Sequence, residues 1–234
     1  MIDTTPNKQN QQTIKDTVLI SGIGLHSGKQ VDMKLVPADV DEGVKFIRSD
    51  KTNNNVINAI WSNVSETVLS TTISNSSKLK ISTIEHLMSA LSGLHIDNLT
   101  VYINACEVPI MDGSSKPFVD LIESVGIEVQ NKKRRILNVK KVIEVKSDNS
   151  SAKIIPNNQF SIDFEIDFPS QLVSKQSCQL QLINGNYKSD IAAARTFGFE
   201  KDVEYLRSNG LALGGSLDNA VVVGENKILN KDGL

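Results

Sequence analysis

The chain lacks the features that mark several large classes of protein. Only 5% of its 234 residues are aromatic, and its formal net charge is −2. Its two cysteines, Cys106 and Cys178, stand far apart without a CxxC pattern, so they predict neither a disulfide framework nor a thiolate zinc site. No uninterrupted apolar run is long enough for a secretory core or a membrane span. These absences favour a soluble protein of a reducing cytoplasm.

Basic residues are too few and too scattered to predict a nucleic-acid partner. The longest basic run is 132–135, which is most simply a solvated linker. With 39% hydrophobic residues the chain can nevertheless bury a real core, and its length allows one large domain or two small ones. An enzyme of this kind that acts on a lipid has to bind it from solution or from the bilayer surface. We therefore expect no transmembrane segment and at most a peripheral membrane contact.

A glycine-rich loop at 21–28 joins two predicted strands within Val18 to Leu35. Its glycines suggest a phosphate cradle. A P-loop, however, needs a glycine and a serine or threonine where Ile23 and Gln30 stand, and the dinucleotide fingerprint needs a glycine in place of Ser27. We expect no nucleotide binding by this loop.

The clearest predicted element is a helix that Gly93 ends. Ser82 is a good N-cap, and Glu85 lies three residues later, which is the capping-box spacing. The apolar stripe of this helix consists of Ile84, Leu87, Met88 and Leu91. A strand is predicted next at 98–103, followed by a second helix that Gly126 ends.

The remaining pattern suggests two domains. We expect a disordered N-terminus at 1–12, a first α+β domain at 13–129, a linker at 130–135 and a second α+β domain at 136–234. In the second domain, Phe160 to Phe168 alternate apolar and polar residues, which predicts a strand with one buried and one wet face. Residues 187–194 are ambiguous, 201–208 predict a helix, and Gly224 is the turn of a predicted hairpin.

Two neighbouring side chains at the start of the first helix carry the clearest chemical signal. Glu85 and His86 project about 100° apart, so both can face one cleft. A histidine beside a carboxylate suits a zinc ligand next to a general base. The same spacing also suits a capping glutamate and a packed or surface histidine. Spacing alone leaves these two interpretations open.

Six motifs in order resemble those of the UDP-3-O-acyl-N-acetylglucosamine deacetylase family. The motifs are Gly22-Ile23-Gly24-Leu25-His26-Ser27-Gly28, Ile81-Ser82-Thr83-Ile84-Glu85-His86-Leu87, Ile96-Asp97-Asn98, Val108-Pro109-Ile110-Met111-Asp112-Gly113-Ser114, Ala194-Arg195-Thr196-Phe197-Gly198-Phe199 and Gly210-Leu211-Ala212-Leu213-Gly214-Gly215-Ser216. The resemblance runs from about Val18 to Leu234. Six motifs in the right order are far more specific than any one of them.

The resemblance implies an α+β fold of two similar domains, each with paired helices on a mainly antiparallel sheet and with the active site between them. It implies a cytoplasmic zinc amidohydrolase of lipid A and hence lipopolysaccharide biosynthesis, with one catalytic Zn²⁺. The substrate implied is UDP-linked acylated N-acetylglucosamine, from which acetate is removed. We also expect a monomer.

The resemblance also implies roles for individual residues. His86 matches a zinc ligand, Glu85 matches the general base, and Thr196 matches a hydroxyl that stabilises the oxyanion. His26 falls in a family motif near the site, and we assign it no role. The expected substrate contacts, which include an acyl passage formed by an insertion at about 199–229, are Lys153, Asp167, Phe168, Phe199, Asp202, Val203, Ala212, Gly215, Ser216, Leu217 and Val222.

The sequence departs from the family in two places. Ile155 stands where some members have a lysine that faces the diphosphate, and Lys153 is the expected substitute. The family's second and third zinc ligands follow the match that ends at Leu234, so we expect the second domain to be incomplete, with an exposed apolar face on its sheet.

Three interpretations follow from these departures. The preferred one is an incomplete copy of a zinc deacetylase, inactive as 234 residues because metal ligands are missing. The second is a shortened, non-catalytic relative that binds the substrate or an interacting protein. The third is a structural remnant in which Glu85 is only a cap.

Overall fold

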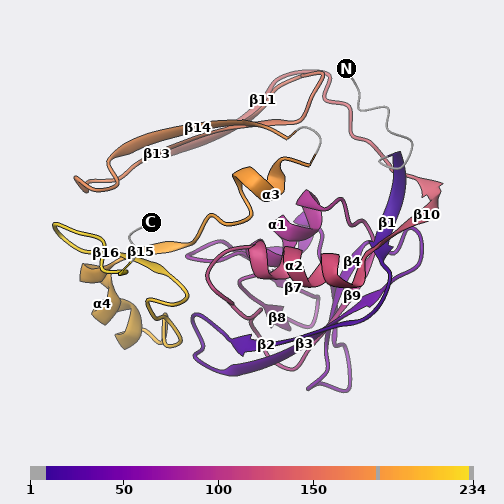
Figure 1. The fold of residues 1–234 in the computed structure, drawn as a ribbon, viewed down its shortest axis with the longest axis horizontal. Coiled ribbons are helices and arrows are strands. Elements are labelled where there is room, and N and C mark those ends of the chain that lie inside the picture. Colours follow the sequence, from indigo (N-terminus) through magenta and orange to yellow (C-terminus); the bar gives the residue numbers. More distant parts are fainter. Residues whose placement is uncertain (1–8, 183–184, 232–234) are drawn as a thin grey trace.

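The computed structural model describes residues 9–182 and 185–231, which form mostly strands, in several small sheets, with few helices (Figure 1). The largest sheet has the strand order β2-β3-β9-β4-β5. Its strands are β2 (Val18–Ile23), β3 (Gln30–Pro37), β4 (Val44–Arg48), β5 (Val56–Asn58) and β9 (Leu99–Ile103). All neighbouring strands in it are antiparallel except β4 and β9. The predicted mixture of helices with mainly antiparallel strands is confirmed at this level.

Two helices cover the core of the part of the chain before residue 136, which we call the first half; the residues from 136 onward are the second half. They are α1 (Glu85–Gly93) and α2 (Lys116–Val125), which pack against each other. The predicted stripe is confirmed in α1 by the burial of Leu87 and Leu91, and Phe118 and Ile122 are fully buried in α2. Because apolar residues three and four apart share one helix face, both helices bury that face against the sheet.

The start of α1 corrects the predicted capping box. The N-cap residue is Ile84, with no side-chain cap, and the Ser82 hydroxyl donates instead to the carbonyl of Cys106 at 3.2 Å. Ser82 pairs with Glu107 as an isolated bridge, and Thr83 has a φ of 56°. The chain is therefore still extended at Ser82 and turns at Thr83, so the helix begins too late for Ser82 to cap it.

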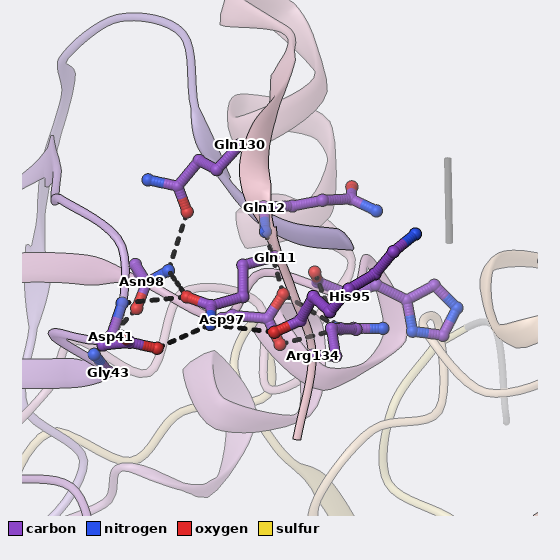
Figure 2. A network of polar contacts seen from close by, with 10 residues as sticks. Gln11, Gln12, Asp41, Gly43, His95, Asp97, Asn98, Gln130 and Arg134 are labelled. Atoms are coloured by element: carbon purple, nitrogen blue, oxygen red, sulfur yellow. Dashed lines mark hydrogen bonds and ion pairs between the residues drawn. The ribbon is translucent and has the colours of Figure 1, made fainter. Parts of the chain in front are cut away.

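A polar network joins the N-terminal strand to the predicted linker (Figure 2). β1 (Asn10–Ile14) pairs with β10 (Ile127–Lys133), and the buried Asn98 amide donates to Gln11 at 2.8 Å and Gln130 at 2.7 Å. The Arg134 guanidinium binds the Asp97 carboxylate at 2.8 Å.

Two predictions about order are therefore wrong in part. Residues 10–12 were expected to be disordered, and they belong to β1. Residues 130–133 were expected to be linker, and they belong to β10. In both cases cross-strand hydrogen bonds and buried amides outweigh a polar composition. Residues 1–8 lie outside the described part, and the predicted domain limits stay predictions.

The other elements form smaller units. One sheet has the order β6-β7-β8, two hairpins pair β11 with β12 and β13 with β14, and β15 pairs with β16 in parallel. The strands are β6 (Val64–Glu66), β7 (Thr72–Ser74), β8 (Lys80–Ile81), β11 (Ile143–Ser147), β12 (Ser150–Ile154), β13 (Ser161–Asp167), β14 (Lys175–Gln181), β15 (Phe197–Phe199) and β16 (Val221–Val223). The helices are α3 (Tyr187–Asp190), α4 (Val203–Ser208) and the 3₁₀ turns Trp61–Asn63 and Glu200–Asp202.

The predicted strand at Phe160 to Phe168 is confirmed as β13, which lies with β14 and β11 along the top of Figure 1. Its apolar face is not buried, since Phe160 is 64% and Phe164 63% exposed. The expected exposed apolar face is thus present, and the expectation of one buried face is wrong for the described residues.

Tyr187 connects the second half of the chain to the helices of the first. Its side chain is buried in the same core cluster as α1 and α2, and its ring lies where a Cβ on Gly93 would meet it at 2.1 Å. The phenol oxygen lies 2.7 Å from the Ser89 hydroxyl and 2.6 Å from the Ser115 hydroxyl. The segment that was ambiguous in the sequence therefore attaches the chain to the core at α1 and α2.

The two halves should differ in sensitivity to loss of a phenylalanine. Phe118→Ala should destabilise the protein by about 3–5 kcal/mol, because a fully buried ring leaves a cavity. Phe164→Ala is the matched control and should change the free energy of unfolding by about 0.5 kcal/mol or less, because its ring is exposed. Urea unfolding measures both, and equal losses would contradict this assignment of the core.

Candidate functional site

The first turn of α1 presents the two residues with the clearest chemical signal. One Glu85 carboxylate oxygen accepts a hydrogen bond from the backbone N–H of Thr71 at 3.0 Å. This contact fixes the direction of the carboxylate, which is partly exposed. Burial lowers the pKa of the His86 imidazole, and the negative charges of Glu85 and Asp112 oppose that shift. The ring is therefore neutral at neutral pH, which is the form that binds metals.

Asp112 lies near His86 in a tight turn. Its carboxylate accepts the backbone N–H of Ser114 at 2.9 Å and the Ser114 hydroxyl at 2.8 Å. Met111 has a φ of 57° and Gly113 a φ of 87°, so the residues on either side of Asp112 adopt left-handed conformations. The turn carries this carboxylate toward α1 and leaves Gly113 facing the second half of the chain.

Thr196 meets this turn through its backbone. Its N–H donates to the Gly113 carbonyl at 2.8 Å, and its own carbonyl accepts from Val221 at 2.9 Å. A Cβ on Gly113 would lie 2.3 Å from the Asn219 carbonyl oxygen and 3.4 Å from the Thr196 methyl carbon. Only glycine allows this approach, which brings the predicted oxyanion residue beside the loop that carries Asp112.

Arg195 strengthens the same contact and has no predicted role in the sequence analysis. Its guanidinium donates to the Asp112 carbonyl at 2.8 Å and to the Asp218 carbonyl at 2.8 Å. Its place beside Thr196 in one motif was the available signal. The place where the Asp112–Gly113 turn meets Thr196 is called the junction below. A cavity of about 480 Å³ lies next to it, and Asp112 and Asn219 are among the lining residues of that cavity. Glu85, His86 and Thr196 do not line it.

His26 lies in the glycine-rich loop, against the predicted acyl passage. Its ring Nδ1 is 3.4 Å from the backbone nitrogen of Ala212, and its carbonyl accepts from Leu213 at 3.2 Å. The Gly214 N–H donates to the Leu25 carbonyl at 3.0 Å. The structure thus places His26 against the segment that contains Ala212, one of the predicted lining residues.

Three phenylalanine rings form an aromatic cluster that contains two predicted substrate contacts. The ring of Phe168 lies 5.5 Å from that of Phe197 and 5.6 Å from that of Phe199, centroid to centroid. The ammonium of Lys201 lies 5.5 Å from the centre of the Phe199 ring. The described structure therefore joins the end of β13 to β15 through ring contacts.

The remaining predicted contacts lie in two parts of the chain, 202–222 and the two hairpins β11–β12 and β13–β14. In the first part, Asp202 and Val203 lie where the 3₁₀ turn meets α4, Val222 lies on β16, and the residues that follow Ala212 are Gly215, Ser216 and Leu217. Lys153 belongs to the β11–β12 hairpin, where its ammonium is 3.7 Å from the Glu144 carboxylate. Asp167 is paired across β13–β14 with Lys175. The described contacts do not bring Lys153 to the aromatic cluster.

Glu107 is a buried acid without a predicted role in the site. Glu107 is 1% exposed, and its carboxylate accepts hydrogen bonds from His26 and Ser27. The signal was a lone acidic residue directly before the apolar run Val108 to Ile110.

Comparison with known proteins identifies the family. The profile described as UDP-3-O-acyl N-acetylglycosamine deacetylase (LpxC) matches residues 11–234. The chain belongs to this family. It is 46% identical over 224 residues to the UDP-3-O-acyl-N-acetylglucosamine deacetylase of Syntrophus aciditrophicus, a match that covers 96% of this chain and 71% of that protein.

Further relatives agree with this assignment. The enzymes of the same name from Shewanella pealeana and Thioalkalivibrio sulfidiphilus are 45% and 46% identical over 226 residues, covering 96% of this chain and 74% of each relative. In this LpxC chain, no helix of the described part combines the length and apolar character of a membrane span.

LpxC proteins are zinc-dependent. Within 9–182 and 185–231, no three His, Cys, Asp or Glu side chains lie close enough together to hold a metal ion. Zinc sites in enzymes take three protein ligands as a rule. The described residues therefore offer His86 as one suitable imidazole and do not by themselves fit the ion.

Adding a methyl group at the junction should separate the two halves. Gly113→Ala should destabilise the protein by about 1–3 kcal/mol or more, because alanine is strained at this φ and its Cβ collides with the Asn219 carbonyl. Gly198→Ala, where a Cβ meets nothing within 4 Å, is the control and should cost about 0.5 kcal/mol or less. Urea unfolding of both variants decides, and a neutral Gly113→Ala would refute the close approach.

Proposed function

We propose that the protein removes acetate from the glucosamine nitrogen of UDP-3-O-acyl-N-acetylglucosamine in lipid A biosynthesis. The observation that supports this most directly is the meeting of α1, with Glu85 and His86, and the Asp112–Gly113 turn with the Thr196 backbone, in a chain of the LpxC family. Relatives named for this activity match 96% of this chain.

Glu85 is the proposed general base. Amide hydrolysis needs a group that takes the proton of the attacking water, and a carboxylate held in one orientation does this. The Thr71 N–H holds one oxygen of Glu85 at 3.0 Å. The same carboxylate then delivers the proton to the nitrogen that leaves.

Thr196 is the proposed oxyanion donor. As water adds to the amide carbonyl, negative charge develops on the carbonyl oxygen, and a hydroxyl already in place stabilises it. Two backbone hydrogen bonds, to Gly113 and from Val221, hold the Thr196 main chain. These two bonds fix the backbone that carries the hydroxyl.

His86 is the proposed first ligand of one catalytic zinc ion, and we propose that the remaining ligands come from outside the described residues. Its lowered pKa keeps the imidazole neutral and ready to bind a metal. Its neighbours Glu85 and Asp112 add negative charge, which favours a cation nearby.

The proposed substrate contacts follow the groups of the substrate. Phe168 and Phe199 offer ring faces on which a uracil can stack, with Asp167 and Asp202 beside them. Lys153 is the proposed cation for the diphosphate. The proposed acyl passage is lined by Val203, Ala212, Gly215, Ser216, Leu217 and Val222.

The exposed apolar face of β13 supports a second α+β unit similar to the first. In the first half the sheet residue Phe46 on β4 is fully buried, whereas Phe160 and Phe164 are exposed. A pair of helices packed on this face would complete two similar domains. We also propose that the protein is a monomer without a nucleic-acid partner.

Replacement of Glu85 separates catalysis from metal binding. In the protein as its cells make it, Glu85→Ala should keep zinc and lower the rate of acetate release by about 10²–10⁴-fold, because the base is lost. His86→Ala should lower the zinc content itself. Glu123→Ala removes an exposed carboxylate on α2 and should leave both unchanged. Full turnover after Glu85→Ala would remove its assignment. Failure of the unaltered protein to release acetate while binding the substrate would favour the non-catalytic alternative.

Zinc analysis of residues 1–234 alone tests the ligand count. We expect well under one zinc per chain and no acetate release, because the described residues contain no cluster of three ligands. Metal content after gel filtration provides the measurement, with His86→Ala as the reference. Tight one-to-one zinc that His86→Ala abolishes would show that this chain completes the site.

A further inference from the structure

Glu107 is a buried acid that the proposed mechanism does not use. It lies after β9 and is 1% exposed. Its backbone is fixed on one side by Ser82, whose N–H donates to the Cys106 carbonyl at 2.9 Å and whose carbonyl accepts from Val108 at 3.0 Å. A carboxylate so completely removed from water needs several donors to be tolerated.

Three donors from two different segments meet this carboxylate. Its Oε1 accepts from the His26 backbone N–H at 2.8 Å and from the Thr83 hydroxyl at 3.0 Å. Its Oε2 accepts from the Ser27 backbone N–H at 2.8 Å. A Cβ on Gly24 would lie 2.4 Å from Oε2, so the missing side chain at that position leaves room for the acid.

The Thr83 contact acts on the start of the catalytic helix. Thr83 has a φ of 56°, a left-handed conformation that is unfavourable for a β-branched residue and persists only when the surroundings enforce it. Two residues later the chain enters α1 at Glu85, with His86 next. The bond from Thr83 to Glu107 therefore helps to hold the turn that sets the direction of both side chains.

The His26 and Ser27 contacts hold a second element, the glycine-rich loop at 21–28. Holding these two N–H groups fixes the loop whose carbonyls at Leu25 and His26 accept from Gly214 and Leu213. A Cβ on Gly214 would lie 2.3 Å from the Gly24 carbonyl oxygen, so the two backbones are in direct contact. Movement of the loop would thus move the segment that follows Ala212.

We propose that Glu107 is a positioning residue that sets the start of α1 and the 212–215 segment relative to each other. This proposal rests on the proposed function, because it assigns Glu85 and the 212–215 segment to one reaction. Glu107 touches neither substrate nor metal in it. A single buried carboxylate accepts hydrogen bonds from Thr83, just before α1, and from His26 and Ser27, in the loop that contacts the 212–215 segment. Weakening this carboxylate therefore loosens both elements.

Glu107→Gln is the informative variant because glutamine keeps the size and replaces one acceptor by a donor. Whichever way its amide turns, at least one of the three donors then faces an NH₂ group. In the protein as its cells make it, kcat should fall about tenfold or more, and KM for the acylated substrate should rise, because the start of α1 and the 212–215 segment are both displaced. Loss of folded molecules alone lowers kcat and leaves KM unchanged.

Asp97→Asn is the matched control. It also weakens a partly buried carboxylate, which binds Arg134 and the Gln12 backbone away from the proposed site. It should lower stability and leave kcat per folded molecule and KM unchanged. Glu107→Gln with the same unchanged kcat and KM as Asp97→Asn would overturn the proposal.

Amide hydrogen exchange tests the coupling without any activity. Glu107→Gln should speed exchange at His26 and Ser27 and also at Leu213 and Gly214, whereas Asp97→Asn should not. Unchanged exchange at Leu213 and Gly214 would overturn the proposal. If the unaltered protein shows no acetate release, the proposed function fails, and this exchange result still decides the role of Glu107.

Discussion

The arrangement of this protein depends on close backbone contacts between segments far apart in the chain. A Cβ on Gly113 or on Gly214 would lie 2.3 Å from a carbonyl oxygen, of Asn219 and of Gly24 respectively. At such separations no side chain fits, and backbone hydrogen bonds replace apolar packing as the main attraction. The two contacts join the first half of the chain to the part that carries Thr196 and the 212–215 segment.

Polar side chains in the interior hold the elements that these contacts require. The Tyr187 hydroxyl lies between Ser89 of α1 and Ser115, the N-cap of α2, and Asn98 joins β1 to β10. Each group has partners that only the native arrangement supplies, so an alternative packing would leave it buried without them. By contrast, the β13–β14 hairpin, which lies along the top of Figure 1, carries exposed apolar side chains such as Phe164.

Periodicity predicted the elements, and Gly93 and Gly126 predicted where the two helices end, but the capping-box spacing did not predict where α1 begins. The strands at Val18 to Leu35 and the helix that Gly126 ends follow from local pattern, which the packing reinforces. The start of α1 was misplaced because a strained Thr83, held by a residue distant in sequence, overrides a good capping signal. The burial of Gln11 was invisible for the same reason, since its partner Asn98 lies far along the chain.

Residue types alone predicted only part of the candidate site. Glu85 and His86 were recognisable as adjacent residue types on a helix, while only the family resemblance selected Thr196. Arg195 and Glu107 were missed because their roles lie in bonds to backbone atoms of remote loops, which leave no periodic trace in the sequence. The Thr196 N–H, which donates to the Gly113 carbonyl, holds Thr196 to the Asp112–Gly113 turn. Native-state hydrogen exchange of the Thr196 amide tests this contact most directly. We predict exchange as slow as that of the β9 amides, and exchange as fast as in the β13–β14 hairpin would contradict the account.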